Sequence, residues 1–235
     1  MAKPPLGKLK AAAIGMLEPP RLDARILAGF RELADLTGTT SDALDECDIA
    51  GVVPASLLRP SDPRARIVGQ AITVLNRVVS ERRKVSGLAD IEAHNLAEPG
   101  DVLVVQGVPN ISSMGGVSAT IGKRQGEAGA IVDGALRDVD HSRAIGYPIW
   151  CSGVSPITGK WRIETMAVND PVHIAAIEVR PGDLVVADEC GVCFVPYARA
   201  AEVLAIAQRL AAAEATRLQA LADGISLAGF VKLPR

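Results

Sequence analysis

The spacing of apolar residues in the first hundred positions predicts a mixture of helices and one strand. Residues 21–34 place apolar side chains at helical intervals. The hydroxyl residues at 39–41 offer N-caps for a short helix over 42–47. Residues 66–76 are rich in β-branched side chains, which favours a strand, and residues 88–97 return to a helical pattern.

Two later segments resemble each other. Pro99-Gly100-Asp101 precedes the apolar run 102–105, and Pro181-Gly182-Asp183 precedes the apolar run 184–187. In each, Pro and Gly set a turn and the apolar run supplies a buried strand. The repetition suggests two sheet layers rather than one doubly wound sheet.

The most organised stretch of the chain lies between these two segments. A glycine-containing loop at 114–116 opens a helix that runs to Arg124 and ends at Gln125-Gly126. Residues 129–132 predict a short buried strand, which we expect Asp133-Gly134 to turn. Arg137 and Asp138 follow, and Asp138 can cap a helix that continues to Ile145.

The rest of the chain predicts two more strands and a long final helix. The strands cover 147–151 and 191–196, and the amphipathic C-terminal helix covers 197–222. Neither a low-complexity linker nor a change of composition divides the chain. A single domain over 1–235 is the simplest account.

Composition restricts the classes of protein that remain. The chain has 235 residues, of which 49% are hydrophobic and 3% aromatic, so a core of Ala, Val, Leu and Ile favours an α/β design. Its net charge of -2 provides no overall positive field for nucleic acid or an anionic membrane. No apolar run reaches the roughly 18 residues of a membrane span, and Glu18-Pro19-Pro20 interrupts the only N-terminal apolar patch. We therefore expect a cytoplasmic enzyme with a small-molecule ligand.

Gly115 and Gly116 form the first candidate site. Two glycines let the backbone approach a ligand, and the following helix presents free N–H groups that suit a carboxylate or a phosphate. The segment matches neither the Walker loop nor the dinucleotide-binding fingerprint. A tight turn before a helix explains the two glycines as well as ligand binding does.

Arg137 and Asp138 form the second candidate site. They follow a strand, and ligands of open α/β folds bind at the carboxyl ends of strands. Arginine offers a planar fork for a carboxylate, and aspartate offers a hard oxygen ligand for a magnesium-type cation. A surface ion pair or a helix cap at Asp138 explains the pair equally well.

The remaining candidates favour structural roles. The three histidines are scattered without metal-ligand spacing, and we expect them to be neutral structural residues. Cys190 and Cys193 have metal-type spacing but no second pair, so reduced thiols are expected.

The central motif resembles the signature of the RraA-like family, which includes the regulator of ribonuclease E activity and the 4-hydroxy-4-methyl-2-oxoglutarate aldolases. The similarity spans about residues 39–205, with the helices at 21–34 and 197–222 outside or at the margin of this core. The matching residues are Gly115, Gly116, Ala119, Thr120, Lys123, Gly126, Gly129, Asp133, Gly134, Arg137 and Asp138, together with the Pro-Gly-Asp segments.

This resemblance implies a single-domain α/β fold, a swivelling-type β/β/α sandwich that assembles as trimers or hexamers with sites between subunits. Aldolase members cleave 2-oxo acids to pyruvate and decarboxylate oxaloacetate with Mg²⁺ or Mn²⁺. The resemblance assigns oxo-acid binding to Arg137, metal binding through water to Asp138, and carboxylate binding to the Gly115–Ser118 loop, through the amides of Val117 and Ser118.

One position departs from the aldolase pattern. Gly116 stands where aldolase members often carry an acidic residue that organises the waters of the metal. A further family carboxylate comes from the C-terminal region of a neighbouring subunit, for which Glu202 and Glu214 are candidates. Two functions therefore stay open: a metal-dependent lyase acting on 2-oxo acids, and a regulator that binds a ribonuclease or another protein without catalysis.

Overall fold

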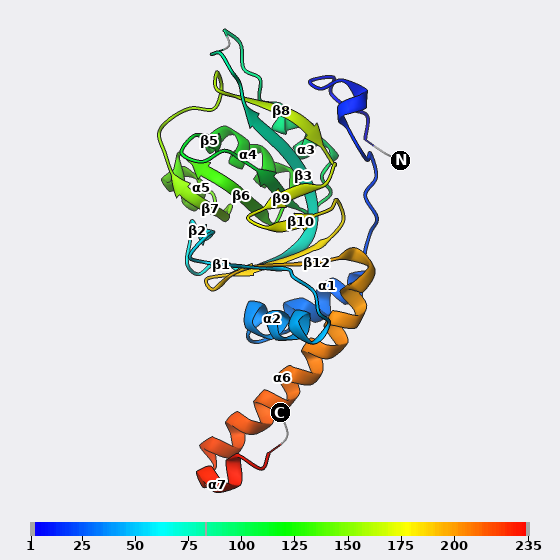
Figure 1. Ribbon diagram of the computed structural model, residues 1–235, viewed down its shortest axis with the longest axis vertical. Coiled ribbons are helices and arrows are strands. Elements are labelled where there is room, and N and C mark those ends of the chain that lie inside the picture. The colour runs from blue at the N-terminus through cyan, green and yellow to red at the C-terminus, as the bar shows by residue number, and fades with distance from the viewer. Residues whose placement is uncertain (1–2, 83, 234–235) are drawn as a thin grey trace.

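The computed structural model describes residues 3–82 and 84–233 and shows a sandwich of two sheet layers with helices on both outer faces (Figure 1). One long strand, β3 (Ile67–Val78), belongs to both layers. Its first half pairs with β11 (Leu184–Asp188), and its second half pairs with β4 (Val102–Gln106) and β8 (Ile163–Val168). The sheet therefore folds over at β3 rather than continuing as one flat layer.

The first layer is antiparallel. Strand β11 pairs with β12 (Gly191–Val195), which pairs with β1 (Val52–Pro54). A separate hairpin, β9 (Val172–Ile174) and β10 (Ile177–Val179), packs with this layer in one apolar core.

The second layer is largely parallel. Strand β4 pairs with β6 (Gly129–Leu136), which pairs with β7 (Ile149–Val154), all in the direction of β3. The short strands β5 (Ser112–Met114) and β2 (Arg59–Pro60) add to β6 and β7. Parallel pairing brings the carboxyl ends of β3, β4, β6 and β7 to one edge, where the candidate residues lie.

Three apolar cores hold the layers together. The middle core fills the space between the sheets and includes Trp150 and Phe194. The second core lies between the parallel layer and helices α3 (Asp90–Leu96), α4 (Gly116–Gln125) and α5 (Val139–Ala144). The third core lies between the antiparallel layer and α1 (Ala24–Arg31), α2 (Leu36–Glu46) and α6 (Ala200–Ala222). This arrangement confirms the expected mixed α/β fold with two sheet layers.

Helix α2 begins earlier than the hydroxyl residues at 39–41 predict. Asp35 is its N-cap and accepts a hydrogen bond from the Gly38 N–H at 3.1 Å. Thr40 lies inside the helix, and its Oγ1 donates to the Leu36 carbonyl at 2.7 Å. Aspartate caps a helix as well as threonine does, and starting here buries Leu36 in the third core.

Strand β6 runs through Asp133-Gly134 instead of turning there. Its register shifts between Val132 and Ala135, and the strand then continues to Leu136 beside β5. A Cβ at Gly134 would lie 2.8 Å from the Val108 nitrogen. Glycine at this position therefore does not form a turn. It lets the neighbouring loop at Val108 lie close to the strand.

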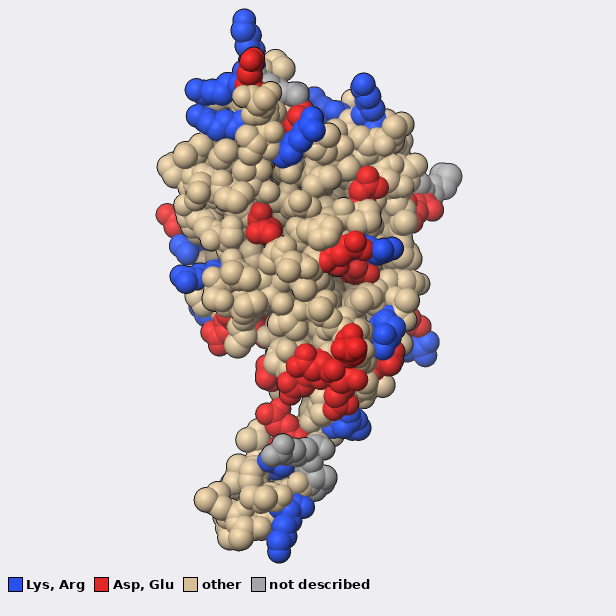
Figure 2. All heavy atoms as spheres, viewed as in Figure 1, with Lys and Arg blue, Asp and Glu red and all other residues tan. Residues whose placement is uncertain are grey.

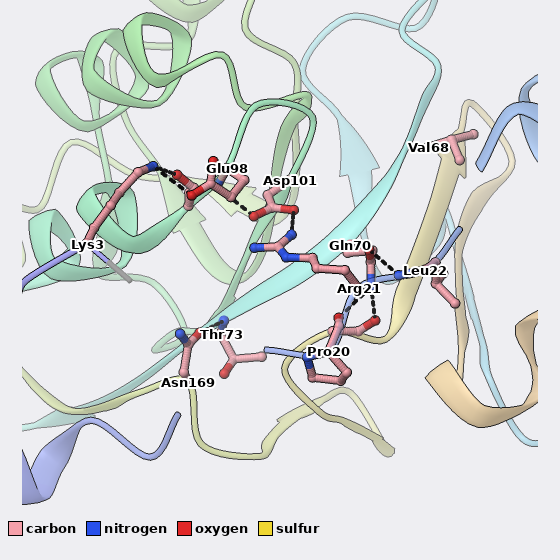
Figure 3. Close-up of polar contacts among 12 residues, drawn as sticks. Lys3, Pro20, Arg21, Leu22, Val68, Gln70, Thr73, Glu98, Asp101 and Asn169 are labelled. Carbon is pink, nitrogen blue, oxygen red and sulfur yellow. Dashed lines mark hydrogen bonds and ion pairs between the residues drawn. The ribbon is translucent and has the colours of Figure 1, made fainter. Parts of the chain in front are cut away.

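An N-terminal strap formed by residues 3–23 crosses the side of the sandwich (Figure 1). Arg21 forms an ion pair with the buried Asp101, and the Gln70 side chain donates to the Pro20 carbonyl at 3.0 Å (Figure 3). Asp101 lies in the turn before β4 and Gln70 lies in the half of β3 that pairs with β11, so the strap contacts both layers.

Helix α6 leaves the body of the molecule after its first two turns (Figure 1). Its buried residues, Ala200, Val203, Leu204 and Ala207, all lie in the N-terminal third of the helix. Short helical segments at Ala11–Ala13, Tyr197–Arg199 and Leu227–Phe230 complete the fold. Among the described residues, none of the helices combines the length and the apolar character needed to cross a membrane.

Candidate active site

Arg137 and Asp138 directly follow β6, at the edge where the parallel strands end. Arg137 Nε lies 3.5 Å from Asp138 Oδ2, and the two side chains are 34% and 47% exposed. The pair is therefore half-open to solvent, with a positive and a negative group accessible together.

Asp138 adopts an unusual backbone conformation and does not cap its own helix. Its φ of 57° lies in the left-handed region, and its side chain makes no capping hydrogen bond to α5. Instead, Oδ2 accepts a hydrogen bond from the Gly116 N–H at 2.9 Å. The expected side-chain cap of α5 is therefore wrong. The Asp138 carboxylate instead lies at the N-terminus of α4, where the helix dipole favours a negative charge.

The two glycines at 115 and 116 make this contact possible. A Cβ at Gly115 would lie 2.9 Å from both Arg137 Nε and Asp138 Oδ2. A Cβ at Gly116 would lie 3.1 Å from a ring carbon of His141, so an acidic residue here requires that ring to move. Gly115 thus permits the pair to approach the helix, and Gly116 leaves the space beside Asp138 open.

The start of α4 supplies backbone donors beside the pair. Gly116 N–H donates to Asp138, and Ala119 N–H donates to the Gly115 carbonyl at 3.0 Å. The N–H groups of Val117 and Ser118 belong to the first turn, where no intrahelical acceptor exists. Together with the helix dipole, they favour an anionic ligand.

A pocket of about 300 Å³ adjoins these donors. Arg137 and Lys160 supply its positive charges and Asp90 its negative charge. This volume suits a small metabolite. Its lining comes from the α4 loop, α3, and the loops before α3 and after β7, and includes Ser86, Leu88, Ser112, Gly115, Val117, Ser118, Thr158 and Gly159.

Asp138 opens onto a second hollow on the other side of the loop. Gly116, Thr120 and His141 line this hollow, and His141 Nε2 lies 2.8 Å from Thr120 Oγ1. Val117 and Ile121 line both spaces. The structure therefore brings Arg137, Asp138 and residues 115–118 together, but the arginine and the aspartate face adjoining spaces.

The donor set suits a weakly held hard cation better than a caged one. Within residues 3–82 and 84–233, no group of three His, Cys, Asp or Glu side chains could hold a metal ion. Mg²⁺ commonly keeps most of its waters and binds one or two carboxylates plus the substrate. A single carboxylate such as Asp138 fits that hydrated mode of binding. The two cysteines with metal-type spacing, Cys190 and Cys193, are free thiols, the first exposed and the second buried.

A buried polar network behind the pocket was missed by the sequence analysis. His94 contacts Glu127 through Nδ1 at 2.7 Å and Ser118 Oγ through Nε2 at 2.8 Å. Burial opposes a charge on His94, but the hydrogen bond to Glu127 and the charges of Glu127 and Asp90 outweigh it and raise the pKa of His94. This shift favours the charged form of His94, in contrast to the neutral histidine that the sequence predicts. The only available signal was a histidine four residues after an aspartate on one helix.

Charge is distributed unevenly over the surface around the site. Figure 2 shows Lys and Arg side chains gathered at one end of the sandwich and Asp and Glu gathered over the helices towards the other end. The loops before α3 and after β7, which carry Arg82 and Lys160, lie at the positive end and also line the pocket. A positive rim attracts anionic ligands to this opening.

A guanidinium, a carboxylate and helix N-terminal amides at the ends of parallel strands define an α/β protein with a site for small anions. The sequence profile of the RraA-like family, described as Aldolase/RraA, matches residues 37–194. The chain belongs to the RraA-like family, which confirms the resemblance.

Relatives in this family carry two kinds of name. A Halalkalibacterium halodurans protein with the provisional name 4-hydroxy-4-methyl-2-oxoglutarate aldolase is 32% identical over 191 residues, covering 80% of this chain and 86% of the relative. A Thermus thermophilus protein named 4-hydroxy-4-methyl-2-oxoglutarate aldolase is 30% identical, covering 57% of this chain and 77% of the relative. The crystal structure of Streptomyces coelicolor RraAS2, described as an unusual member of the RNase ES inhibitor RraA family, superimposes with a TM-score of 0.71 at 30% identity, covering 81% and 93% of the two chains.

Proposed function

We propose that the protein is a divalent-metal-dependent lyase that acts on 2-oxo acids, by retro-aldol cleavage to pyruvate, by decarboxylation of oxaloacetate, or by both. The observation that carries this proposal is the convergence of Arg137 and the first turn of α4 on one small pocket. Aldolase names among relatives at about 30% identity support the same class of reaction.

Each group has a defined part in this proposal. The amides of Val117 and Ser118 bind the substrate carboxylate at the positive end of α4. Arg137 donates to the 2-oxo oxygen, where electrons collect when the C3–C4 bond breaks and an enolate forms. A guanidinium stabilises that oxyanion more strongly than the neutral carbonyl, so it lowers the barrier.

The proposed cofactor is Mg²⁺ or Mn²⁺, held by Asp138 largely through water. When bound, the ion would add positive charge near the developing oxyanion. Asp138 keeps one carboxylate oxygen on the Gly116 N–H and has the other for a metal-bound water. Because Gly116 offers no second carboxylate, we expect metal affinity to be modest.

We also propose a homotrimer or homohexamer. Exposed apolar side chains continue along α6 and beyond it, with Leu218 59% and Leu227 76% exposed. Glu202 forms an ion pair with Arg199 of its own chain, whereas Glu214 lies on the projecting part of α6. Glu214 is therefore better placed to reach a neighbouring subunit. A monomer in sedimentation at micromolar concentration would refute this assembly.

The alternative function is a regulator that binds a ribonuclease or another protein without catalysis. The similarity to Streptomyces coelicolor RraAS2, described as a member of an RNase ES inhibitor family, supports this alternative. Gly116 also supports it, because an acidic residue often stands there in the aldolases. A 2-oxo-acid pocket is not needed for such contact.

Pyruvate release separates the two functions. The protein is assayed with oxaloacetate and with 4-hydroxy-4-methyl-2-oxoglutarate, with Mg²⁺, with Mn²⁺ and with a chelator. The lyase proposal requires metal-dependent pyruvate release above the rate of the free metal ion. Absence of turnover with both substrates would favour the regulator.

A further inference from the structure

Five polar side chains form a continuous chain from the pocket into the core. Ser118 Oγ donates to Asp90 Oδ2 at 2.6 Å and contacts His94 Nε2 at 2.8 Å. His94 Nδ1 contacts Glu127 Oε1 at 2.7 Å, and Tyr147 donates to the other oxygen of Glu127 at 2.5 Å. Asp90 and Ser118 line the pocket, and 23% of the Asp90 side chain is exposed, whereas His94 and Glu127 are fully buried.

The hydrogen-bond directions identify the protonation state of this network. Glu127 Oε2 accepts from the Tyr147 hydroxyl, and with Glu127 taken as a carboxylate its Oε1 accepts from His94 Nδ1. Ser118 donates its only hydroxyl hydrogen to Asp90, so its oxygen must accept a hydrogen bond from His94 Nε2. His94 then carries hydrogens on both ring nitrogens and is an imidazolium between two carboxylates.

The fold makes specific room for this arrangement. A Cβ at Gly122 on α4 would lie 2.5 Å from Glu127 Oε2 and 2.6 Å from the Tyr147 hydroxyl. Glycine at 122 therefore allows the Glu127–Tyr147 contact, although it weakens the helix that carries it. A buried charged pair is costly unless all its groups are satisfied, and here they are.

The network can bring one proton to Asp90, at the pocket, while the total number of protons in the network stays the same. The Nε2 proton of His94 passes to Ser118 Oγ while the Ser118 hydroxyl proton passes to Asp90 Oδ2. The products are a neutral histidine, an intact serine and a protonated Asp90. Ser118 acts as a bridge here rather than as a nucleophile, since the proton that it gives to Asp90 is replaced by the proton from His94.

We propose that Asp90 donates the proton that converts the enolate to pyruvate, and that His94 resupplies Asp90 through Ser118. This inference rests on the proposed lyase function. In the step, the enolate carbon C3 forms a bond to the Asp90 proton while the C2–O⁻ group becomes a carbonyl. Asp90 is left as a carboxylate and His94 neutral, and one proton from solvent restores the network.

The charged surroundings of His94 predict how this step depends on pH. Asp90 lies on the same helix, Glu127 lies between α4 and β6, and Tyr147 precedes β7. Both carboxylates favour the imidazolium, so the proton reserve persists above the pH at which an isolated histidine would lose it. Without the Ser118 oxygen, the proton of His94 has no hydrogen-bonded path to Asp90.

Exchange of the pyruvate methyl hydrogens in D₂O measures the proposed step in reverse. Proton NMR follows the exchange with the Mg²⁺-loaded protein of residues 1–235. We expect Asp90→Asn to slow exchange by about a hundred-fold or more, the usual effect of losing a general acid. The matched control is Asp140→Asn, since Asp140 is fully exposed on α5 and forms an exposed ion pair with Arg143 at 3.3 Å. It should exchange like the wild type.

A second variant tests the relay itself and does not depend on how well Asp90→Asn folds. Ser118→Ala keeps Asp90 and the Ser118 amide but removes the bridging oxygen. Exchange starts from the network that has lost its proton, so in the wild type it should decline as pH falls through the raised pKa of His94. Without the bridge this decline should no longer follow His94, a change that a purely structural serine would not cause. Wild-type exchange in Asp90→Asn, or an unchanged pH profile in Ser118→Ala, would overturn the inference. If the wild type neither exchanges pyruvate nor releases it from oxaloacetate, the lyase function itself fails.

Discussion

Replacement of Arg137 by lysine separates a catalytic arginine from a structural one. The lysine keeps a positive charge near Asp138 but loses the planar fork that can hold an oxo-acid at two points. Arg137 is 34% exposed, and its ion pair with Asp138 spans 3.5 Å. The pair therefore resembles a surface salt bridge in its contribution to folding.

The expected magnitudes differ widely. A surface ion pair contributes about 0 to 1 kcal/mol, so the melting temperature should fall by no more than roughly 4 °C for a chain of this size. Loss of a charged donor at a developing oxyanion costs roughly 3 to 4 kcal/mol, or about a hundred- to a thousand-fold in kcat. Arg137→Lys should lose much of the rate, and Arg137→Ala nearly all of it.

The assay measures pyruvate release and thermal unfolding on the same preparations. A large loss of kcat with a nearly unchanged melting temperature supports the catalytic role. A lowered melting temperature with unchanged kcat per folded molecule would identify Arg137 as structural. Wild-type turnover in folded Arg137→Ala would refute the lyase as described here.

Three further predictions concern the neighbouring groups. Asp138→Asn should abolish Mg²⁺- or Mn²⁺-dependent turnover without unfolding, because the amide still accepts from Gly116 but has lost its charge; activity that persists with metal would contradict metal binding there. Gly115→Ala should slow turnover by about a hundred-fold, since the new Cβ would lie only 2.9 Å from Arg137 Nε and from Asp138 Oδ2 and would push both side chains away. Gly153→Ala is the matched control, because a Cβ there has no atom within 4 Å, and it should be neutral. The pKa of His94 is raised above its ordinary value of 6.5, so a charged His94 stabilises the folded state. This stabilisation is complete below about pH 6.5 and is lost as pH rises through the pKa of the folded state. Urea unfolding should therefore show wild type losing stability relative to His94→Gln as pH rises above about 6.5; a difference that stays constant with pH would mean that the pKa of His94 is not raised.

The sequence by itself predicted many of the helices and strands and the Arg137–Asp138 half of the candidate site. Proline and glycine before apolar runs identified β4 and β11, because turn formation and burial are short-range properties. Gly126 ends α4 with a φ of 81°, as a glycine after a helix predicts. Arg137 and Asp138 were found because they follow a buried strand.

The local pattern failed where a distant segment intervened. Asp133-Gly134 has the composition of a turn, yet β5 and the loop at 107–108 hold these residues in β6. The residues at 39–41 are good N-caps, but burial of Leu36 moved the start of α2 to Asp35. In both cases tertiary packing outweighed a local preference.

Only the tertiary structure decided the polar partners of the site. Asp138 turns to Gly116, 22 residues earlier, and His94 meets Glu127, 33 residues later. Hydrophobic periodicity shows which positions are buried but not which buried polar groups pair with each other. That pairing depends on the packing of α4 beside α3, since a polar group inside the core is stable only where the fold brings it a partner.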